Sequence, residues 1–198
     1  MATTTAAPEQ DGAGRLDPAV AETGRPEEAA GSADLAEAAE VSVAAARARA
    51  GNSMRTKEFL SKLEHDRIVA AIREAESKTS GQIRVFIQRG KLDVDPLIAA
   101  QKKFHRLGMH KMPDRNAVLI FVAPRAHKFA VVGDKAIHEK CGEPFWQKLV
   151  DEMREHFRNE KFTDALVEAI REAGNALASH FPRTSTSSGQ LPASVIET

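Results

Sequence analysis

Residues 117–133, AVLIFVAPRAHKFAVVG, decide the fold of this chain. The first part, AVLIFVA (117–123), is a continuous apolar run, which is typical of a strand buried on both faces of a sheet. PRAHK (124–128) is a short connection, and FAVVG (129–133) resumes the apolar pattern, so we predict a hairpin of two antiparallel strands. A strand buried on both faces needs helices on both sides of its sheet.

The residues before this hairpin predict a helix, a strand and a second helix. Apolar residues recur at helical spacing between Phe59 and Ala75, and QIRVFIQ (82–88) then alternates apolar and polar residues as a strand does. Asp95 and Pro96 are an N-cap and a first-turn proline, and they open the next helix. Because a helix joins the first two strands, these strands should be parallel, with a right-handed crossover.

Two further helices follow the hairpin. Glu143 and Pro144 begin the first, and we expect Thr163 to cap the second. A short helical turn also fits residues 135–140. The predicted order of elements is therefore α-β-α-β-β-α-α, and the fold class is α/β, a three-layer α/β/α sandwich with a small mixed sheet.

The composition divides the chain into three segments. Residues 1–54 are rich in Ala, Glu, Pro and Gly, are acidic, and hold few large apolar residues, so we expect a disordered tail. Residues 55–182 form the predicted α/β domain. Residues 183–198 are rich in Ser and Thr and are expected to be a flexible C-terminal tail.

Charge, apolar runs and cysteine content exclude several classes of protein. The formal net charge is zero, which argues against nucleic-acid binding. No stretch approaches the roughly 20 apolar residues of a membrane span, and the first residues lack the basic start and apolar core of a secretory signal. Cys141 is the only cysteine, so neither a disulfide framework nor a multi-cysteine zinc cluster can form within the chain. We therefore expect a soluble, cytoplasmic protein.

Three stretches carry a resemblance to a known family. They are KTSGQIRVFIQ (78–88), FHRLGMHKMPDRNAVLIFVAPRAHKFAVVGDKAI (104–137) and FRNEKFTDALVEAIREAGNAL (157–177), and together they resemble the TPM domain family. That family includes thylakoid-lumen proteins linked to photosystem repair, and proteins described as acid phosphatases or as divalent-metal binders. The resemblance thus implies a TPM-like domain with a phosphatase or metal-binding role.

The predicted topology brings oxygen-bearing side chains to one edge of the sheet. If the third strand is antiparallel to the first two, its exit lies beside their entries, and four side chains should converge there: Asp114, Asn116, Asp134 and Glu139. Carboxylate and amide oxygens suit Ca²⁺ or Mg²⁺, so we predict a weak divalent-cation site and no organic cofactor. The alternative is that Asp114, Asn116 and Asp134 are turn and cap residues.

These residues leave three functions open. The leading hypothesis is a small soluble TPM-type module that binds a divalent cation, a protein partner, or both. The alternatives are a metal-assisted acid phosphatase acting on phosphate monoesters and a purely structural interaction domain. A cysteine phosphatase is excluded, because the position six residues after Cys141 holds Gln147 instead of a phosphate-binding arginine. Catalytic residues stay unknown, since no catalytic motif is visible.

Overall fold

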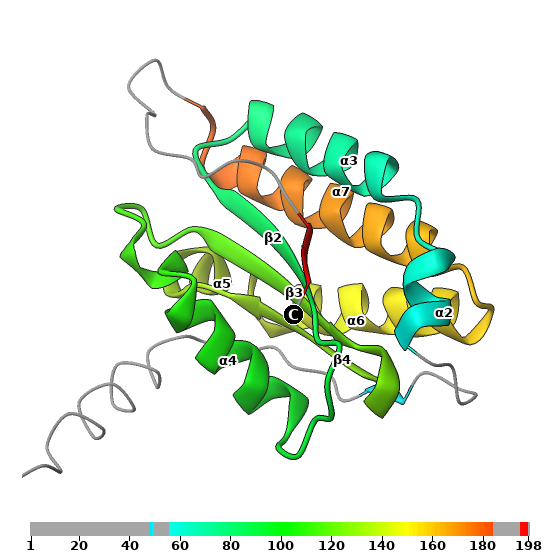
Figure 1. The fold of residues 1–198 in the computed structure, drawn as a ribbon. Helices are drawn as coiled ribbons and strands as arrows, with labels where there is room; N and C mark the ends of the chain where they lie inside the picture. Colours follow the sequence, from blue (N-terminus) through cyan, green and yellow to red (C-terminus); the bar gives the residue numbers. More distant parts are fainter. Residues whose placement is uncertain (1–47, 50–55, 184–194, 198) are drawn as a thin grey trace, which may run out of the picture.

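The computed structural model describes residues 48–49, 56–183 and 195–197, with only the backbone described for the first pair (Figure 1). The strands are β1 (Ala48–Arg49), β2 (Gln82–Ile87), β3 (Ala117–Ala123), β4 (Lys128–Gly133) and β5 (Val195–Glu197). The helices are α2 (Thr56–Ser61), α3 (His65–Ser77), α4 (Pro96–Arg106), α5 (Lys135–Cys141), α6 (Glu143–Arg158) and α7 (Phe162–His180), with short 3-10 helices η1 (Met109–Lys111) and η2 (Pro124–Ala126). This order contains every predicted element, including the short helix after the hairpin.

The strands form one mixed sheet in the order β1-β4-β3-β2-β5. β2 and β3 are parallel, with Gln82 opposite Ala117, and β3 and β4 are antiparallel, with Val118 opposite Gly133. Both orientations confirm the prediction. β3 lies between two partners, which explains why its sequence is apolar at every position.

Helices cover both faces of the sheet, as the predicted sandwich requires. α3, α6 and α7 lie on one face and α4 lies on the other (Figure 1). Because side chains alternate along a strand, β3 supplies both layers of the core. Val118 and Ile120 belong to the cluster on the α7 side, whereas Leu119 and Phe121 belong to the cluster on the α4 side.

The predicted signals at the starts of α4 and α6 are confirmed. Asp95 is the N-cap of α4, and its side chain accepts a hydrogen bond from Leu97 N. α6 begins at Glu143 and has a proline in its first turn. Gly142 stands between α5 and α6 with φ of 72°, a left-handed conformation that glycine adopts without steric cost.

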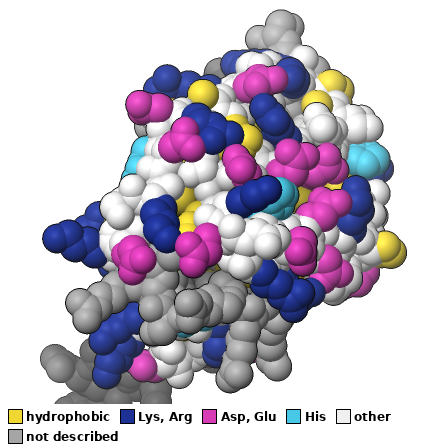
Figure 2. Space-filling view, turned by 90° about the vertical axis from the view of Figure 1, so that its right-hand side faces the viewer, with side chains coloured by type: hydrophobic (Ala, Val, Ile, Leu, Met, Phe, Trp, Pro, Cys, Tyr) yellow, Lys and Arg dark blue, Asp and Glu magenta, His cyan; other side chains and the backbone are white. Residues whose placement is uncertain are grey.

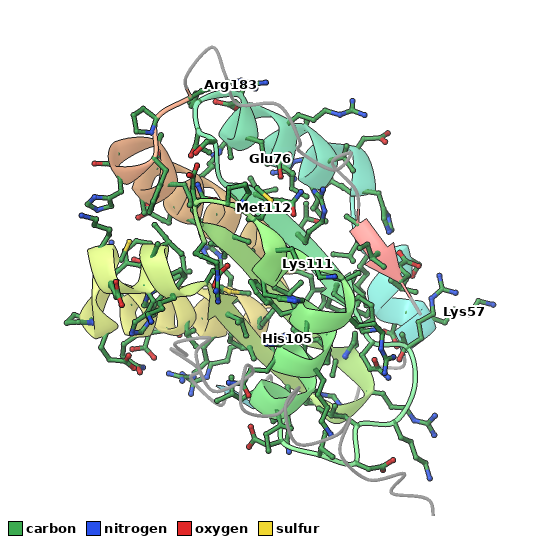
Figure 3. All side chains as sticks on the ribbon, turned by 90° about the vertical axis from the view of Figure 1, so that its left-hand side faces the viewer. Lys57, Glu76, His105, Lys111, Met112 and Arg183 are labelled. Atoms are coloured by element: carbon green, nitrogen blue, oxygen red, sulfur yellow. The ribbon has the colours of Figure 1, made fainter. Side chains whose placement is uncertain are left out.

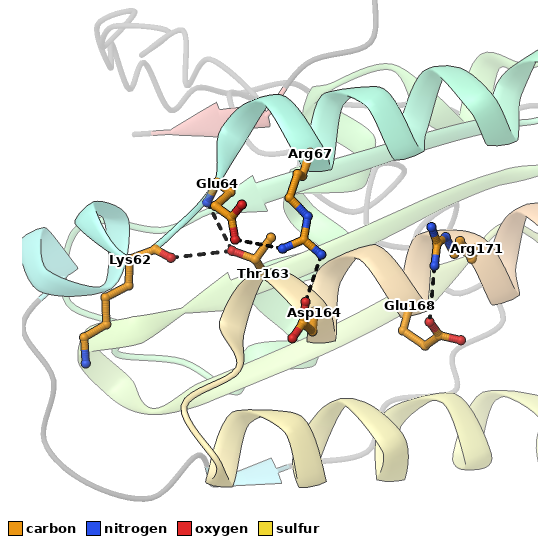
Figure 4. A network of polar contacts seen from close by, with 7 residues as sticks. All are labelled: Lys62, Glu64, Arg67, Thr163, Asp164, Glu168 and Arg171. Atoms are coloured by element: carbon orange, nitrogen blue, oxygen red, sulfur yellow. Dashed lines mark hydrogen bonds and ion pairs between the residues drawn. The ribbon is translucent and has the colours of Figure 1, made fainter.

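Thr163 does not cap α7, contrary to the prediction. α7 begins at Phe162, so Thr163 lies inside the first turn. Its Oγ1 instead accepts a hydrogen bond from Glu64 N, at 3.1 Å, and Glu64 is the N-cap residue of α3 (Figure 4). Arg67 adds ion pairs to Glu64 and to Asp164 across the same junction. The threonine therefore joins the starts of two helices that are distant in sequence.

Two short strands, β1 and β5, add to the predicted sheet. β1 pairs antiparallel with β4, and β5 pairs in parallel with β2. Both come from segments that we expected to be tails. Most of residues 1–54 and 184–198 lie outside the described residues, so the expected disorder of these tails and the domain limits stay predictions. No helix in the described ranges is long and apolar enough to cross a membrane.

Candidate functional site

The candidate site lies at the end of the sheet where β2 and β3 begin and β4 ends. Two backbone hydrogen bonds join the loops at this end. Asp134 N donates to Ala117 O at 2.8 Å, and Ala136 N donates to Arg115 O at 3.1 Å. Figure 3 views the molecule from this side, with Lys111 in η1, which precedes β3 in the chain. The loops before β3 and after β4 are thus held together by their backbones.

Asp134 is a fully buried charged group of the site, with a side chain that is 0% exposed. Its Oδ1 accepts hydrogen bonds from Lys135 N at 2.8 Å and from Arg115 Nε at 2.9 Å, so Asp134 is the N-cap of α5. Burial raises the pKa of the Asp134 carboxyl, although these two hydrogen bonds and the charges of Arg115 and His110 act in the opposite direction. Oδ2 is buried and has no hydrogen-bond partner among the described residues.

Asn116 and Asp114 form a second group, joined through Ser80. Asn116 Nδ2 donates to Ser80 Oγ at 3.0 Å, and Ser80 Oγ donates to Asp114 Oδ2 at 3.0 Å. Asn116 is fully buried, whereas Asp114 is exposed. Within the described part of the chain, Asn116 Oδ1 is a buried oxygen without a hydrogen-bond partner. The exposed carboxylate of Asp114 is thus joined through Ser80 to a buried amide whose oxygen has no partner among the described residues.

Strand alternation separates these two groups. Asp134 is two residues from Val132 and so shares its face of the sheet, which packs on the α4 side. Asn116 is two residues from Val118 and so shares the opposite face, which packs on the α7 side. Glu139 is exposed on α5 and lies about 7.5 Å along the helix axis from Asp134. The structure thus brings Asp114 and Asn116 together, holds Asp134 beside them on the other side of the sheet end, and leaves Glu139 apart.

Arg115 is the residue of this site whose role the sequence did not reveal. Its backbone has φ of 47°, a left-handed conformation that is uncommon for a residue with a Cβ. This turn sends the guanidinium to Asp134, and the Arg115 side chain is 29% exposed. Its Nη2 is buried and has no hydrogen-bond partner in the described ranges. A cationic side chain thus already compensates the charge of the buried carboxylate.

The aromatic and sulfur groups nearby serve packing. Trp146 is fully buried, and a Cβ on Gly133 would lie 2.5 Å from its ring, so only glycine fits that position. His138 stacks on Trp146 with 6.3 Å between ring centroids. Burial raises the pKa of the Cys141 thiol, which is the opposite of what a reactive cysteine needs. These residues fix α5 and α6 at the sheet end and offer no nucleophile.

The donor set fits a divalent cation only in part. Among the described residues, no group of three or more His, Cys, Asp or Glu side chains is arranged to hold a metal ion. Asp114 and the amide oxygen of Asn116 are hard ligands of the right kind, and Ca²⁺ accepts several waters in addition. Asp134 could add a charge only in competition with Arg115. A metal at this end would therefore be held by few protein ligands.

Other surfaces offer less chemistry. A shallow cavity of about 130 Å³ lies between α3 and α7. It is lined by small residues and rimmed by charges: Ala71, Glu74, Ala75, Lys78, Arg171, Gly174 and Asn175. On the face shown in Figure 2, acidic and basic side chains are interspersed and hydrophobic ones are scattered. Such a surface shows neither a large apolar patch nor a field of one sign.

Two of three comparisons with known proteins found matches. A family model described as "TPM domain" matches residues 54–176. Among solved structures, the NMR structure of BA42 protein from the psychrophilic bacterium Bizionia argentinensis is 35% identical, with a TM-score of 0.63, and the match covers 68% of this chain and 92% of that one. The N-terminal domain of cg2496 protein from Corynebacterium glutamicum is 16% identical, with a TM-score of 0.46, over 64% of this chain and 76% of that one. A search of curated proteins finds no match.

Proposed function

The chain belongs to the TPM domain family, and we propose that its domain is a binding module that takes a divalent cation, Ca²⁺ or Mg²⁺, at the end of the sheet. The observation that carries this proposal is Asn116 Oδ1, a buried oxygen without a hydrogen-bond partner in the described structure, whose amide is joined through Ser80 to the exposed carboxylate of Asp114. A buried acceptor left unpaired costs free energy, and a cation or its bound water would satisfy it. Asp134 Oδ2, which is also buried and without a partner among the described residues, lies on the other side of the sheet end.

Asp114 is the first ligand in this proposal, because it is exposed and its orientation is held by Ser80. Asn116 Oδ1 is the second ligand, and waters complete the six to eight positions that Ca²⁺ prefers. Asp134 contributes its charge only when the cation displaces the Arg115 guanidinium from its carboxylate. With so few ligands, and with the cationic side chains of Arg115 and Lys135 nearby, we expect dissociation constants on the order of 10⁻⁴ to 10⁻³ M.

Protons compete with the metal at this site. Because burial raises the pKa of Asp134, its carboxyl is more readily protonated than a solvated one, and a protonated carboxyl cannot serve as an anionic ligand. Cation affinity should therefore fall as the pH is lowered from neutrality through the raised pKa of Asp134.

The test is a titration of the full chain with CaCl₂ and with MgCl₂, followed by backbone amide chemical shifts. We expect residues 114–116 and 133–135 to shift together. Asp114→Asn and Asp134→Asn should each remove the response, and Arg115→Gln should tighten binding because it removes the competing cation. Asp93→Asn is the matched control, since Asp93 is an exposed acid in the loop after β2, at the opposite end of that strand. Shifts confined to other residues, or none at 10 mM metal, would contradict the proposal.

Two other proposals remain testable with the same material. Robust hydrolysis of a generic phosphate monoester that is lost in Asp114→Asn would make the domain a metal-assisted phosphatase. The buried thiol of Cys141 is a poor nucleophile, and Ser80 Oγ donates to the carboxylate of Asp114, which is only a weak base, so we expect this assay to be negative. A cytoplasmic location is likewise our proposal, and fractionation of cells that express the full-length chain would check it.

A further inference from the structure

The C-terminal strand β5 is a short segment held by the edge of β2. Its register pairs Val195 with Val85, Ile196 with Phe86, and Glu197 with Ile87. β5 lies beside β2 at the border of the sheet (Figure 1). A strand of three residues that runs along a sheet edge is the geometry in which extended peptides bind to other domains.

The two apolar side chains of β5 enter different layers of the core. Val195 packs against the cluster on the α7 side, and Ile196 packs against the cluster on the α4 side. Both keep partial exposure, whereas Val85 and Phe86 on β2 are fully buried. The edge of β2 therefore offers an apolar contact on each face of the sheet to any segment that pairs with it.

Glu197 is the anchor of the segment. Its Oε1 lies 2.7 Å from His65 Nε2, and its other carboxylate oxygen is paired with Arg89. His65 begins α3 and Arg89 follows β2, so two separate elements converge on one carboxylate. Burial by itself would raise the pKa of Glu197, but the hydrogen bonds from Arg89 and His65 outweigh it, and the pKa is lowered. The domain thus carries a preformed receptor for an acidic side chain, made of the Arg89 guanidinium and the His65 imidazole.

We propose that the edge of β2, with His65 and Arg89, is a peptide-binding groove whose ligand is an extended segment of a partner protein with two successive apolar residues followed by an acid. In this chain, residues 195–197 have that chemistry and occupy the groove in competition with the partner. Charge complementarity and the seated segment support this peptide site, which is independent of the proposed cation site.

The connecting segment 184–194 sets how strongly the chain's own strand competes. A tether of this length gives an effective concentration on the order of 1 mM. If a free peptide binds the groove with a dissociation constant of about 0.1 mM, the tethered strand should weaken its apparent affinity about tenfold. Loosening β5 should therefore expose the groove to a measurable extent.

The experiment uses the full chain and a fluorescent peptide with the sequence LPASVIET, residues 191–198. Glu197→Lys places a positive charge against His65 and Arg89, so β5 should leave the groove. We expect this variant to bind the peptide about tenfold more tightly than the original chain does. The amides of residues 85–87 should shift as the peptide is added.

Reversing the charges supplies the matched control. A peptide with lysine at the glutamate position, LPASVIKT, should not bind Glu197→Lys. Arg89→Glu in the original chain repels the chain's own Glu197, so this variant should bind LPASVIKT and should not bind LPASVIET. Equal affinity of Glu197→Lys and the original chain for LPASVIET would overturn the proposal. So would a concentration-dependent dimer of the original chain that the peptide dissolves, because the occupant would then be the strand of a second copy.

Discussion

The ion pair between Arg115 and Asp134 gives the sharpest test of how the sheet end is built. Arg115→Ala removes the guanidinium and leaves the carboxylate of Asp134, which is 0% exposed, with only the hydrogen bond from Lys135 N. Alanine carries a Cβ as arginine does, so the cost of the left-handed backbone at this position stays the same. The change therefore reports the side-chain interaction.

The expected magnitude follows from the burial of the two partners. Removing one member of a fully buried pair costs about 3–5 kcal/mol, and a hydrogen bond to a charged group is worth about 1.5–3 kcal/mol. Because the Arg115 side chain is 29% exposed, water screens the pair, and we expect the lower value. A loss of about 2 kcal/mol corresponds to a fall in Tm of about 4–8 °C for a chain of this size.

The loss should also depend on pH. Arg115 opposes the effect of burial, so without it the pKa of Asp134 rises further. When the pKa of an acid is higher in the folded than in the unfolded protein, its ionised form destabilises the fold at neutral pH. This destabilisation disappears as the pH falls through the folded pKa, because the acid is then protonated. The destabilisation caused by Arg115→Ala should therefore be smaller at pH 4.5 than at pH 7.

Urea unfolding followed by Trp146 fluorescence measures this free energy, because the tryptophan is fully buried in the folded state. Arg125→Ala is the control, since Arg125 is exposed on η2 and should change stability by less than about 0.5 kcal/mol. In the double variant with Asp134→Asn, the two losses should be less than additive by about 1 kcal/mol or more. Equal stabilities of Arg115→Ala and Arg125→Ala, or strictly additive losses, would refute the reasoning.

Three other predictions concern packing, a helix junction and β5. Gly133→Ala should lose about 1–3 kcal/mol in urea unfolding, because its Cβ would overlap the Trp146 ring, whereas Gly90→Ala, with its nearest neighbouring atom 3.5 Å away, should be nearly neutral. Thr163→Val should lose about 1–2 kcal/mol by leaving Glu64 N unpaired, while Thr163→Ser should keep most of the stability, and equal losses would contradict the assigned hydrogen bond. Because the pKa of Glu197 is lowered, its contacts are fully present above the ordinary glutamate pKa and are lost as the pH falls. The protection of the Val195 and Ile196 amides, measured relative to the intrinsic exchange rate at each pH, should therefore fall in acid, and Glu197→Gln should remove this pH dependence.

The fold could be predicted because each large element carries its own periodic signal. The apolar run of β3 indicated a strand buried on both faces, and the spacing around α4 and α6 located their first turns. Parallel and antiparallel pairing then followed from the connections between the strands. The same topology indicated that Asp114, Asn116 and Asp134 lie near one end of the sheet.

The details of the site could not be predicted, because they depend on side-chain directions and on contacts between distant residues. Nothing in the spacing shows that the turn at Arg115 aims its guanidinium at Asp134. β5 escaped prediction because three residues are too few to show a period, and its anchor joins Glu197 to His65 across most of the domain. Thr163 has the chemistry of a helix cap, but the sequence does not say which helix it serves.

If Arg115 and a cation compete for Asp134, the effect of Ca²⁺ on unfolding free energy can show whether Asp134 binds a cation or serves only as a helix cap and ion-pair partner. If a cation and Arg115 exchange at Asp134, Arg115→Ala should weaken the apo domain and tighten the cation site. With assumed dissociation constants of about 10⁻³ M for the original chain and about 10⁻⁴ M for the variant, 10 mM Ca²⁺ stabilises them by about 1.4 and about 2.7 kcal/mol.

The initial gap of about 2 kcal/mol should therefore shrink to about 0.7 kcal/mol in 10 mM Ca²⁺. Urea unfolding of both chains with and without CaCl₂, at constant ionic strength, measures this change. A gap that stays the same in Ca²⁺ would mean that Asp134 serves only as the N-cap of α5 and the partner of Arg115. If Ca²⁺ reduces the difference in unfolding free energy between the original chain and Arg115→Ala, the cation and Arg115 compete for Asp134. Only a ligand that displaces Arg115 binds more tightly when the arginine is removed.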